Sequence, residues 1–234
     1  MEKEKNYELK DLFKGVGVIF LYLIVSTLPY SFISLFGINY NDLNAIVQQI
    51  YLIFYEICLT LIIVYIYKKD FIPNFKDFIK NIKKYFKKYI KYWFIMLGLM
   101  VLSNYIVTFF TSTIVSQNQQ SVIDSLKQAP IYTIIITTFI APIIEELVFR
   151  LSFKKIFAHT NILFIFFSGL FFGMMHVLSS LENLVDLLFI IPYSIPGFIF
   201  AYLYTESKNI CVPILLHFIH NSIMLILQFI LLYI

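Results

Sequence analysis

Five polar residues with the chemistry needed for hydrolysis lie inside long apolar segments of this 234-residue sequence. A carboxylate among apolar side chains can act as a general base toward water, and a nearby histidine can share that water. Histidine and asparagine side chains can also donate hydrogen bonds to the oxyanion that forms when water attacks an amide carbonyl. The five residues are Glu145, Glu146, His176, His217 and Asn221.

The two adjacent carboxylates are expected to differ in role. Glu146 and Arg150 stand four residues apart, so a helix places them on one face as an ion pair. Glu145 points about 100° away from that face and has no basic partner within its own helix. The alternative is that both carboxylates serve the arginine or reach toward the membrane surface. It is weaker, because a second acid adds like-charge repulsion.

The histidines allow two interpretations. His217 and Asn221 share one helical face, and His220 lies beside them. His176 follows Gly169 and Gly173, small residues that let helices approach closely. Taken singly, each polar residue could be a hydrogen-bonding contact between helices. Taken together, they could form one hydrolytic site.

The elements that position these residues are membrane helices. Apolar residues make up 60% of the chain and charged residues 14%, whereas a soluble domain carries about 25% charged residues. We expect an all-α, polytopic bundle forming a single membrane domain over residues 1–234. About 20 apolar residues are needed to cross a bilayer. The first run is too long for a signal peptide and should be retained. Seven runs qualify: 15–36, 45–67, 91–111, 131–152, 161–179, 184–204 and 210–233.

The basic residues predict the orientation. With a cytoplasmic N-terminus, every lysine and arginine among the 18 falls on the cytoplasmic side except Lys127. The sequence therefore predicts a multi-pass protein of the cell membrane with a cytoplasmic N-terminus. Nucleic-acid binding is excluded as the explanation of the basic clusters, because each one flanks an apolar span. Cys58 and Cys211 lie in separate apolar runs and are expected to be core residues.

Two connections have a character of their own. Apolar residues between Phe75 and Trp93 recur at helical spacing with lysines between them, which predicts an amphipathic interfacial helix before the third span. A solvated basic loop is the alternative. The connection 113–129 is polar and precedes Pro130, so we expect a loop, one that could lie over the site.

Depth supports a single site. With helices rising 1.5 Å per residue, Glu145, His176, His217 and Asn221 are expected about 15, 20, 10 and 16 Å from the cytoplasmic boundary. Ionisable groups at such depths cost about 2.5 to 3.5 kcal/mol each and mark function by default. No GxSxG, HExxH or CxxC motif is present, and Ser168, Ser179 and Ser222 have no evident base, so serine catalysis is a poor alternative.

The pattern resembles the CPBP family of CAAX prenyl proteases and bacteriocin-processing (Abi) intramembrane proteases. The family motifs EExxxR, FxxxH and HxxxN correspond to Glu145 to Arg150, Phe172 to His176 and His217 to Asn221. They cover about the last hundred residues, whereas the first 130 match only as generic spans. The resemblance implies an intramembrane endopeptidase with Glu145 as base, His176 activating water, His217 and Asn221 stabilising the oxyanion, and Glu146 and Arg150 holding the base.

The resemblance leaves the cofactor and substrate open. Members of the family have been described as metalloproteases, and Glu145, His176 and His217 could supply a zinc shell. A metal-free glutamate mechanism uses the same residues, and the helical spacing of His217 and Asn221 favours it slightly. The expected partners are membrane lipid and a membrane-associated or lipidated peptide or protein. Neither the substrate's identity nor the oligomeric state can be read from the sequence.

Two other functions compete with the protease. A bacteriocin-immunity or scaffolding protein could keep the family fold without proteolysis, although the intact motifs argue against it. A carrier could use Glu56 in the second span and the prolines Pro192 and Pro196 in the sixth. Prolines and a single acid in a membrane bundle are more often kinks and a neutral, hydrogen-bonded carboxyl group.

Overall fold

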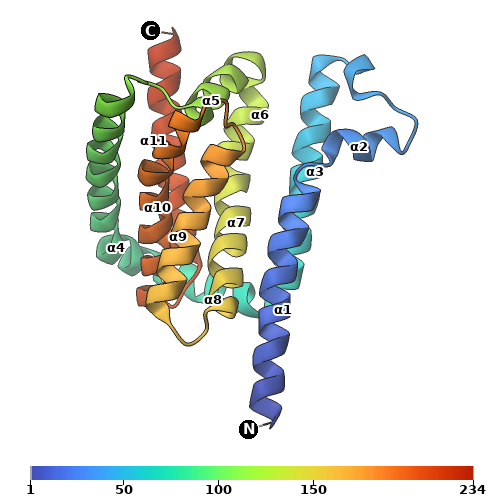
Figure 1. Ribbon diagram of the computed structural model, residues 1–234. Helices are drawn as coiled ribbons and strands as arrows, with labels where there is room; N and C mark the ends of the chain where they lie inside the picture. Colours follow the sequence, from blue (N-terminus) through green and yellow to red (C-terminus); the bar gives the residue numbers. More distant parts are fainter. Residues whose placement is uncertain (1, 234) are drawn as a thin grey trace.

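The protein is a bundle of helices (Figure 1). The computed structural model describes residues 2–233, and within that range no strand occurs, as the all-α prediction requires. The longer helices run roughly side by side. In chain order the elements before the site are α1 (Glu2–Val25), α2 (Pro29–Ser34), η1 (Tyr40–Asp42), α3 (Ala45–Ile66), α4 (Lys68–Thr111) and α5 (Gln117–Gln128).

The helices of the C-terminal half carry all the predicted site residues. One long helix of five consecutive segments comes first, with two π turns inside it. It is followed by α9 (Asn161–Leu178), the 3₁₀ helix η4 (Leu184–Phe189), α10 (Ile190–Ser207) and α11 (Cys211–Tyr233). The five segments of the long helix are α6 (Pro130–Ile135), η2 (Ile136–Ile140), α7 (Ala141–Glu146), η3 (Leu147–Ser152) and α8 (Phe153–Ile156).

Six helical segments in the described range are long and apolar enough to cross a membrane. They correspond to the second through seventh predicted spans, which confirms a multi-pass membrane protein. The predicted first span, 15–36, is not one helix, because α1 starts at Glu2 and ends at Val25. Pro29 disfavours helical backbone at Leu28, which has φ −105° and ψ 8°, so the chain turns there before α2.

The third span is preceded by the predicted amphipathic helix. Both belong to α4, with a kink where Asn81 leaves helical geometry at φ −118° and ψ 16°. The first part of α4 crosses one end of the bundle and the second part runs along its side (Figure 1). Phe78 and Trp93 are buried, while Phe75, Ile79 and Phe86 stay exposed, as expected of a helix that also faces lipid.

The connection 113–129 was predicted as a loop, and that prediction is wrong. Residues Gln117–Gln128 form α5, capped by Ser116, whose side chain accepts a hydrogen bond from the Gln119 amide at 3.2 Å. Val122 and Leu126 stand one helical turn apart, and Leu126 is fully buried. A serine cap followed by apolar residues at this spacing is a helix signal that the polar composition obscured.

Glycines bring α9 and α10 into direct contact. A Cβ added to Gly197 would lie 2.6 Å from the carbonyl oxygen of Gly169, and one added to Gly173 would lie 2.7 Å from the Ser194 nitrogen. No side chain fits between these backbones. The predicted close approach at Gly169 and Gly173 is therefore present, and it sets the position of His176 farther along α9.

A buried asparagine ties the start of α11 to the start of α4. The side-chain nitrogen Nδ2 of Asn209 donates to the Asn74 carbonyl at 2.9 Å and to the Asp77 carboxylate at 3.0 Å. The Asn74 side chain in turn accepts a hydrogen bond from the Ile210 amide at 2.7 Å. These bonds satisfy the polar groups at the beginning of the helix that carries His217 and Asn221.

Candidate active site

A buried ion pair lies at the centre of the predicted site. Arg150 Nε donates to Glu146 Oε2 at 2.7 Å, Arg150 Nη2 donates to Glu146 Oε1 at 3.2 Å, and both side chains are completely buried. Arg150 Nη1 reaches across to α9 and donates to Ser168 Oγ at 2.7 Å. Ser168 then donates to the Phe149 carbonyl at 2.7 Å. The pairing predicted from the i, i+4 spacing is present.

His217 connects this ion pair to the second carboxylate. Its Nδ1 lies 3.0 Å from Glu146 Oε1, and its Nε2 lies 3.8 Å from Glu145 Oε2. Glu146 is held ionised by Arg150 and can only accept, so Nδ1 carries the proton in this contact. In a neutral ring, Nε2 then has a free lone pair and lies 3.8 Å from Glu145 Oε2.

Glu145 lacks the partners that Glu146 has. Within the described residues its Oε2 atom is buried and has no hydrogen-bond partner, although 15% of the side chain is exposed. The two adjacent carboxylates thus have different surroundings. An unpartnered carboxylate oxygen costs free energy when buried, and such groups call for a functional explanation.

His176 is held from its own helix. Its Nδ1 lies 2.9 Å from the Phe172 carbonyl, which only accepts, so Nδ1 donates and Nε2 keeps a lone pair in the neutral ring. The Phe172 ring lies 4.4 Å from the His176 ring and 5.7 Å from the His217 ring, centroid to centroid. Arg150 Cζ sits 5.0 Å from the centroid of the same Phe172 ring. Phe172 therefore joins the histidines of α9 and α11.

Asn221 bonds to a π turn rather than to a histidine. The side-chain nitrogen Nδ2 of Asn221 donates to the Thr137 carbonyl in η2 at 2.9 Å. The other π turn, η3, offers the Phe149 carbonyl to Ser168 in the same way. Wide π turns inside α-helices recur at functional sites. Here each one presents a main-chain acceptor to a neighbouring helix, and both flank the Glu145–Glu146 pair.

The structure brings some predicted residues together and leaves others apart. Glu145, Glu146, Arg150 and His217 form one continuous network, while His176 joins it through Phe172 and Asn221 through the π turn. His220 is buried on the same helix as His217, and its Nδ1 has no hydrogen-bond partner in the described part of the chain. Sequence reasoning missed the supporting roles of Ser168 and Thr137, for which the sequence carries no signal.

A zinc shell of Glu145, His176 and His217 is not assembled. Both histidines have the free Nε2 that a metal ligand needs, with Nδ1 bonded to an oxygen as in many metal sites. Across residues 2–233, however, no three histidine, cysteine, aspartate or glutamate side chains lie close enough to hold a metal ion. The arrangement as it stands does not fit that shell, and the mechanism below uses only the side chains themselves.

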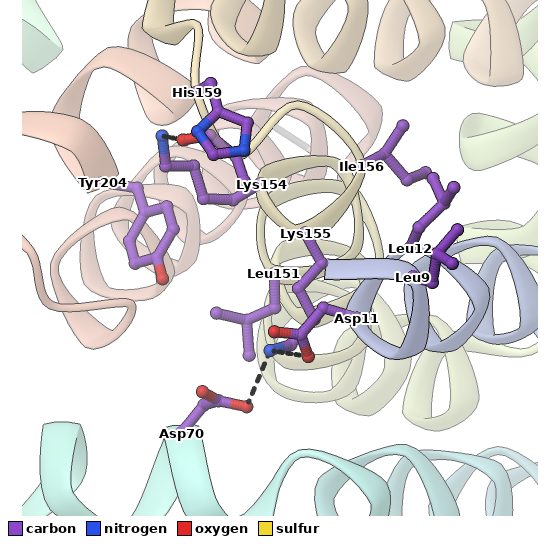
Figure 2. A pocket seen from close by; sticks show the side chains of 11 residues that line it. Leu9, Asp11, Leu12, Asp70, Leu151, Lys154, Lys155, Ile156, His159 and Tyr204 are labelled. Atoms are coloured by element: carbon purple, nitrogen blue, oxygen red, sulfur yellow. Dashed lines mark hydrogen bonds and ion pairs between the residues drawn. The ribbon is translucent and has the colours of Figure 1, made fainter. Parts of the chain in front are cut away.

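A cavity of about 680 Å³ lies apart from these residues (Figure 2). Its walls include residues of α1, of α8 and of the turn that follows α8. Lys155 spans part of it, with Nζ 3.0 Å from Asp11 and 3.8 Å from Asp70. Its other walls include Leu9, Leu12, Leu151, Lys154, Ile156, His159 and Tyr204. None of the predicted site residues lines it, so the candidate site does not coincide with this cavity.

Residues 127–223 match the family described as "Type II CAAX prenyl endopeptidase Rce1-like". This range contains every predicted site residue. This part of the chain is therefore similar to the Rce1-like CAAX prenyl endopeptidases. The match supports the CAAX-protease part of the predicted resemblance, in a chain that crosses the membrane several times.

Two relatives carry names that agree with this family. The chain is 34% identical over 115 residues to the "Putative membrane peptidase YdiL" of Bacillus subtilis (strain 168), covering 48% of this chain and 43% of the relative. It is 30% identical over 142 residues to the "Membrane-embedded CAAX protease MroQ" of Staphylococcus aureus (strain USA300), covering 57% and 54%. The chain thus spans about half the length of these relatives. No solved structure matches.

Proposed function

We propose that this protein is an intramembrane endopeptidase whose Glu145 activates water to cleave a membrane-associated or lipidated peptide or protein. The carrying observation is the Glu145 carboxylate, whose buried oxygen has no hydrogen-bond partner among the described residues and lies 3.8 Å from His217 Nε2. Its neighbour Glu146 is fully engaged by Arg150 and His217. Of the two glutamates, only Glu145 is therefore available to take a proton from water.

In the proposed reaction Glu145 first accepts a proton from water and later donates it to the leaving amine. Water placed between Glu145 and His176 attacks the peptide carbonyl carbon and gives its proton to the Glu145 carboxylate. The carbonyl becomes a tetrahedral oxyanion. As the C–N bond breaks, Glu145 returns the proton to the leaving amine, which restores the carboxylate.

His217 and Asn221 are proposed to stabilise the oxyanion, under a condition that the geometry sets. Because His217 Nδ1 donates to Glu146, Nε2 carries a hydrogen only when the ring is doubly protonated. The donor role therefore requires His217 as an imidazolium. Asn221 has two amide hydrogens, one of which goes to the Thr137 carbonyl, so the second can be donated to the substrate.

Glu145→Gln is the direct test. The variant should reach the membrane and keep its thermal stability, because glutamine has nearly the same shape, but cleavage should fall by about 10² to 10⁴-fold with the loss of the base. Comparative proteomics of the variant strain should show an accumulated membrane-associated precursor. Glu206→Gln, an exposed change at the end of α10, is the matched control. Undiminished cleavage by Glu145→Gln would rule out the assigned base.

The cofactor and orientation are separate parts of the proposal. Metal analysis of active, purified protein before and after chelation separates a zinc enzyme from a metal-free glutamate peptidase. We place the chain in the cell membrane with its N-terminus in the cytoplasm, on the strength of the basic residues.

A further inference from the structure

An aromatic side chain outside every sequence motif lies on the ring of His176. Tyr193, in α10, stacks on the imidazole with centroids 5.5 Å apart and planes 18° from parallel. Among the described residues the His176 ring has one hydrogen bond, from Nδ1 to the Phe172 carbonyl. This bond fixes one nitrogen of the ring, and the aromatic ring stacked on its face contributes to its orientation, and so to the direction of Nε2.

The hydroxyl group of Tyr193 is held by the first turn of α5. The hydroxyl oxygen of Tyr193 lies 2.8 Å from Ser116 Oγ, and the side-chain nitrogen Nδ2 of Asn118 donates to it at 3.2 Å. Ser116 is also the cap of α5, so its oxygen binds the helix and the tyrosine together. The tyrosine ring packs beside the buried side chains of Val107, Val177 and Phe189.

The same turn of α5 is attached to two further elements. The Gln119 side chain donates to the Gln228 side chain of α11 at 3.0 Å, and the Gln117 side chain donates to the Glu182 carboxylate at 3.0 Å. Glu182 lies in the connection between α9 and η4. The first turn of α5 is therefore bonded through side chains to the helix of His217 and to the connection that follows the helix of His176.

We propose that Tyr193 is a positioning residue for His176, and that the first turn of α5 holds Tyr193 in place. Its effect on catalysis rests on the proposed function, whereas the contact itself can be tested without any substrate. A catalytic group displaced by about 1 Å can cost about 10²-fold in rate, so loss of the stacked ring should lower kcat far more than it changes KM.

The kinetic test compares substitutions of two tyrosines in one helix. Tyr193→Leu removes the stacked ring, and its kcat should fall by about 10 to 10²-fold with KM within about twofold. Tyr193→Phe and Asn118→Ala keep the ring but loosen its attachment, so kcat should fall severalfold. Tyr202→Leu is the control, because Tyr202 contacts Tyr92 with hydroxyl oxygens 3.4 Å apart and does not touch His176.

A chemical readout makes the test independent of activity. Diethylpyrocarbonate modifies accessible histidine nitrogens, and mass spectrometry reports the rate at His176. We expect severalfold faster modification in folded Tyr193→Leu and an unchanged rate in Tyr202→Leu. If Tyr193→Leu does not fold, Tyr193→Phe serves, with a smaller increase expected.

Two results would overturn the inference. One is an unchanged His176 modification rate in every folded Tyr193 variant. The other is a loss of activity in Tyr202→Leu equal to that in Tyr193→Leu, which would indicate a general packing effect in α10. An inactive wild-type protein would instead count against the proposed function, and the modification rates would still decide the role of Tyr193.

Discussion

Glu145 and Glu146 are adjacent in sequence but have different surroundings. Glu146 accepts from Arg150 and His217 inside a fully buried pair, while a Glu145 oxygen stays without a hydrogen bond. Charges this deeply buried are tolerated when they are paired, and the cost appears when one partner is removed. Substitution of Glu145 should therefore lower activity, whereas substitution of Glu146 should lower both activity and the stability of the folded protein.

Removing either member of the buried pair should destabilise the protein. Glu146→Ala or Arg150→Ala leaves an unpaired charge in the core, and we expect a loss of about 3 to 5 kcal/mol together with lower folded yield and lower activity. Thermal unfolding in detergent measures the first effect. Lys155→Ala, which breaks the partly exposed contact with Asp11, should cost about 0 to 1 kcal/mol. Equal losses at both sites would contradict this account.

At the scale of elements, two π turns and one helix crossing decide where the site residues lie. The π turns η2 and η3 bracket α7, which carries both glutamates, and offer carbonyl groups to Asn221 and Ser168. The crossing of α9 and α10 depends on glycines that leave no room for a side chain. The π turns of the long helix therefore bind side chains of α11 and α9, and the glycines set how closely α9 and α10 approach.

Gly173→Ala tests the helix crossing. The added Cβ would lie 2.7 Å from the Ser194 nitrogen and 2.9 Å from the Ile190 carbonyl oxygen, backbone atoms that cannot turn aside. We expect α9 and α10 to separate, which lowers the thermal midpoint and displaces His176. Gly98→Ala is the control, because a Cβ there meets nothing within 4 Å. It should be neutral or stabilise by about 0.5 to 1 kcal/mol through helix propensity. A Gly173→Ala protein as stable and active as wild type would refute the argument.

At the scale of the whole molecule, the two polar connecting regions lie at opposite ends of the bundle. The first part of α4, rich in lysine, crosses the end near the N-terminus, while α5 lies at the other end (Figure 1). This arrangement agrees with the proposed orientation, in which lysines of α4 face the cytoplasm and Lys127 of α5 faces outward.

Cysteine labelling in intact cells measures this orientation. In a protein with Cys58 and Cys211 replaced by alanine, Lys127→Cys should react with a membrane-impermeant maleimide added outside. Lys80→Cys should react only after the cells are permeabilised. Both positions are exposed, so accessibility within the protein does not decide the result. The opposite labelling pattern would reverse the proposed topology.

Properties that depend on residues close to one another in the sequence could be predicted from the sequence. The membrane helices follow from apolar length, and the Glu146–Arg150 pair follows from a spacing of four residues. The motifs of Glu145, His176, His217 and Asn221 identified the residues of the candidate site through the family resemblance. Errors arose where a local signal was weak or overlooked, as in α5 and the break before Pro29.

Only the tertiary structure decided which residues contact one another across helices. His217 bonds to Glu146 over 71 residues, and Asn221 bonds to Thr137 over 84 residues. Tyr193 reaches Ser116 over 77 residues and stacks on His176. Helical periodicity shows which face of a helix is apolar, but not which neighbour that face meets, because the neighbour is chosen by the packing of the whole bundle. The five polar residues were therefore visible in the sequence, while the supports that orient them were not.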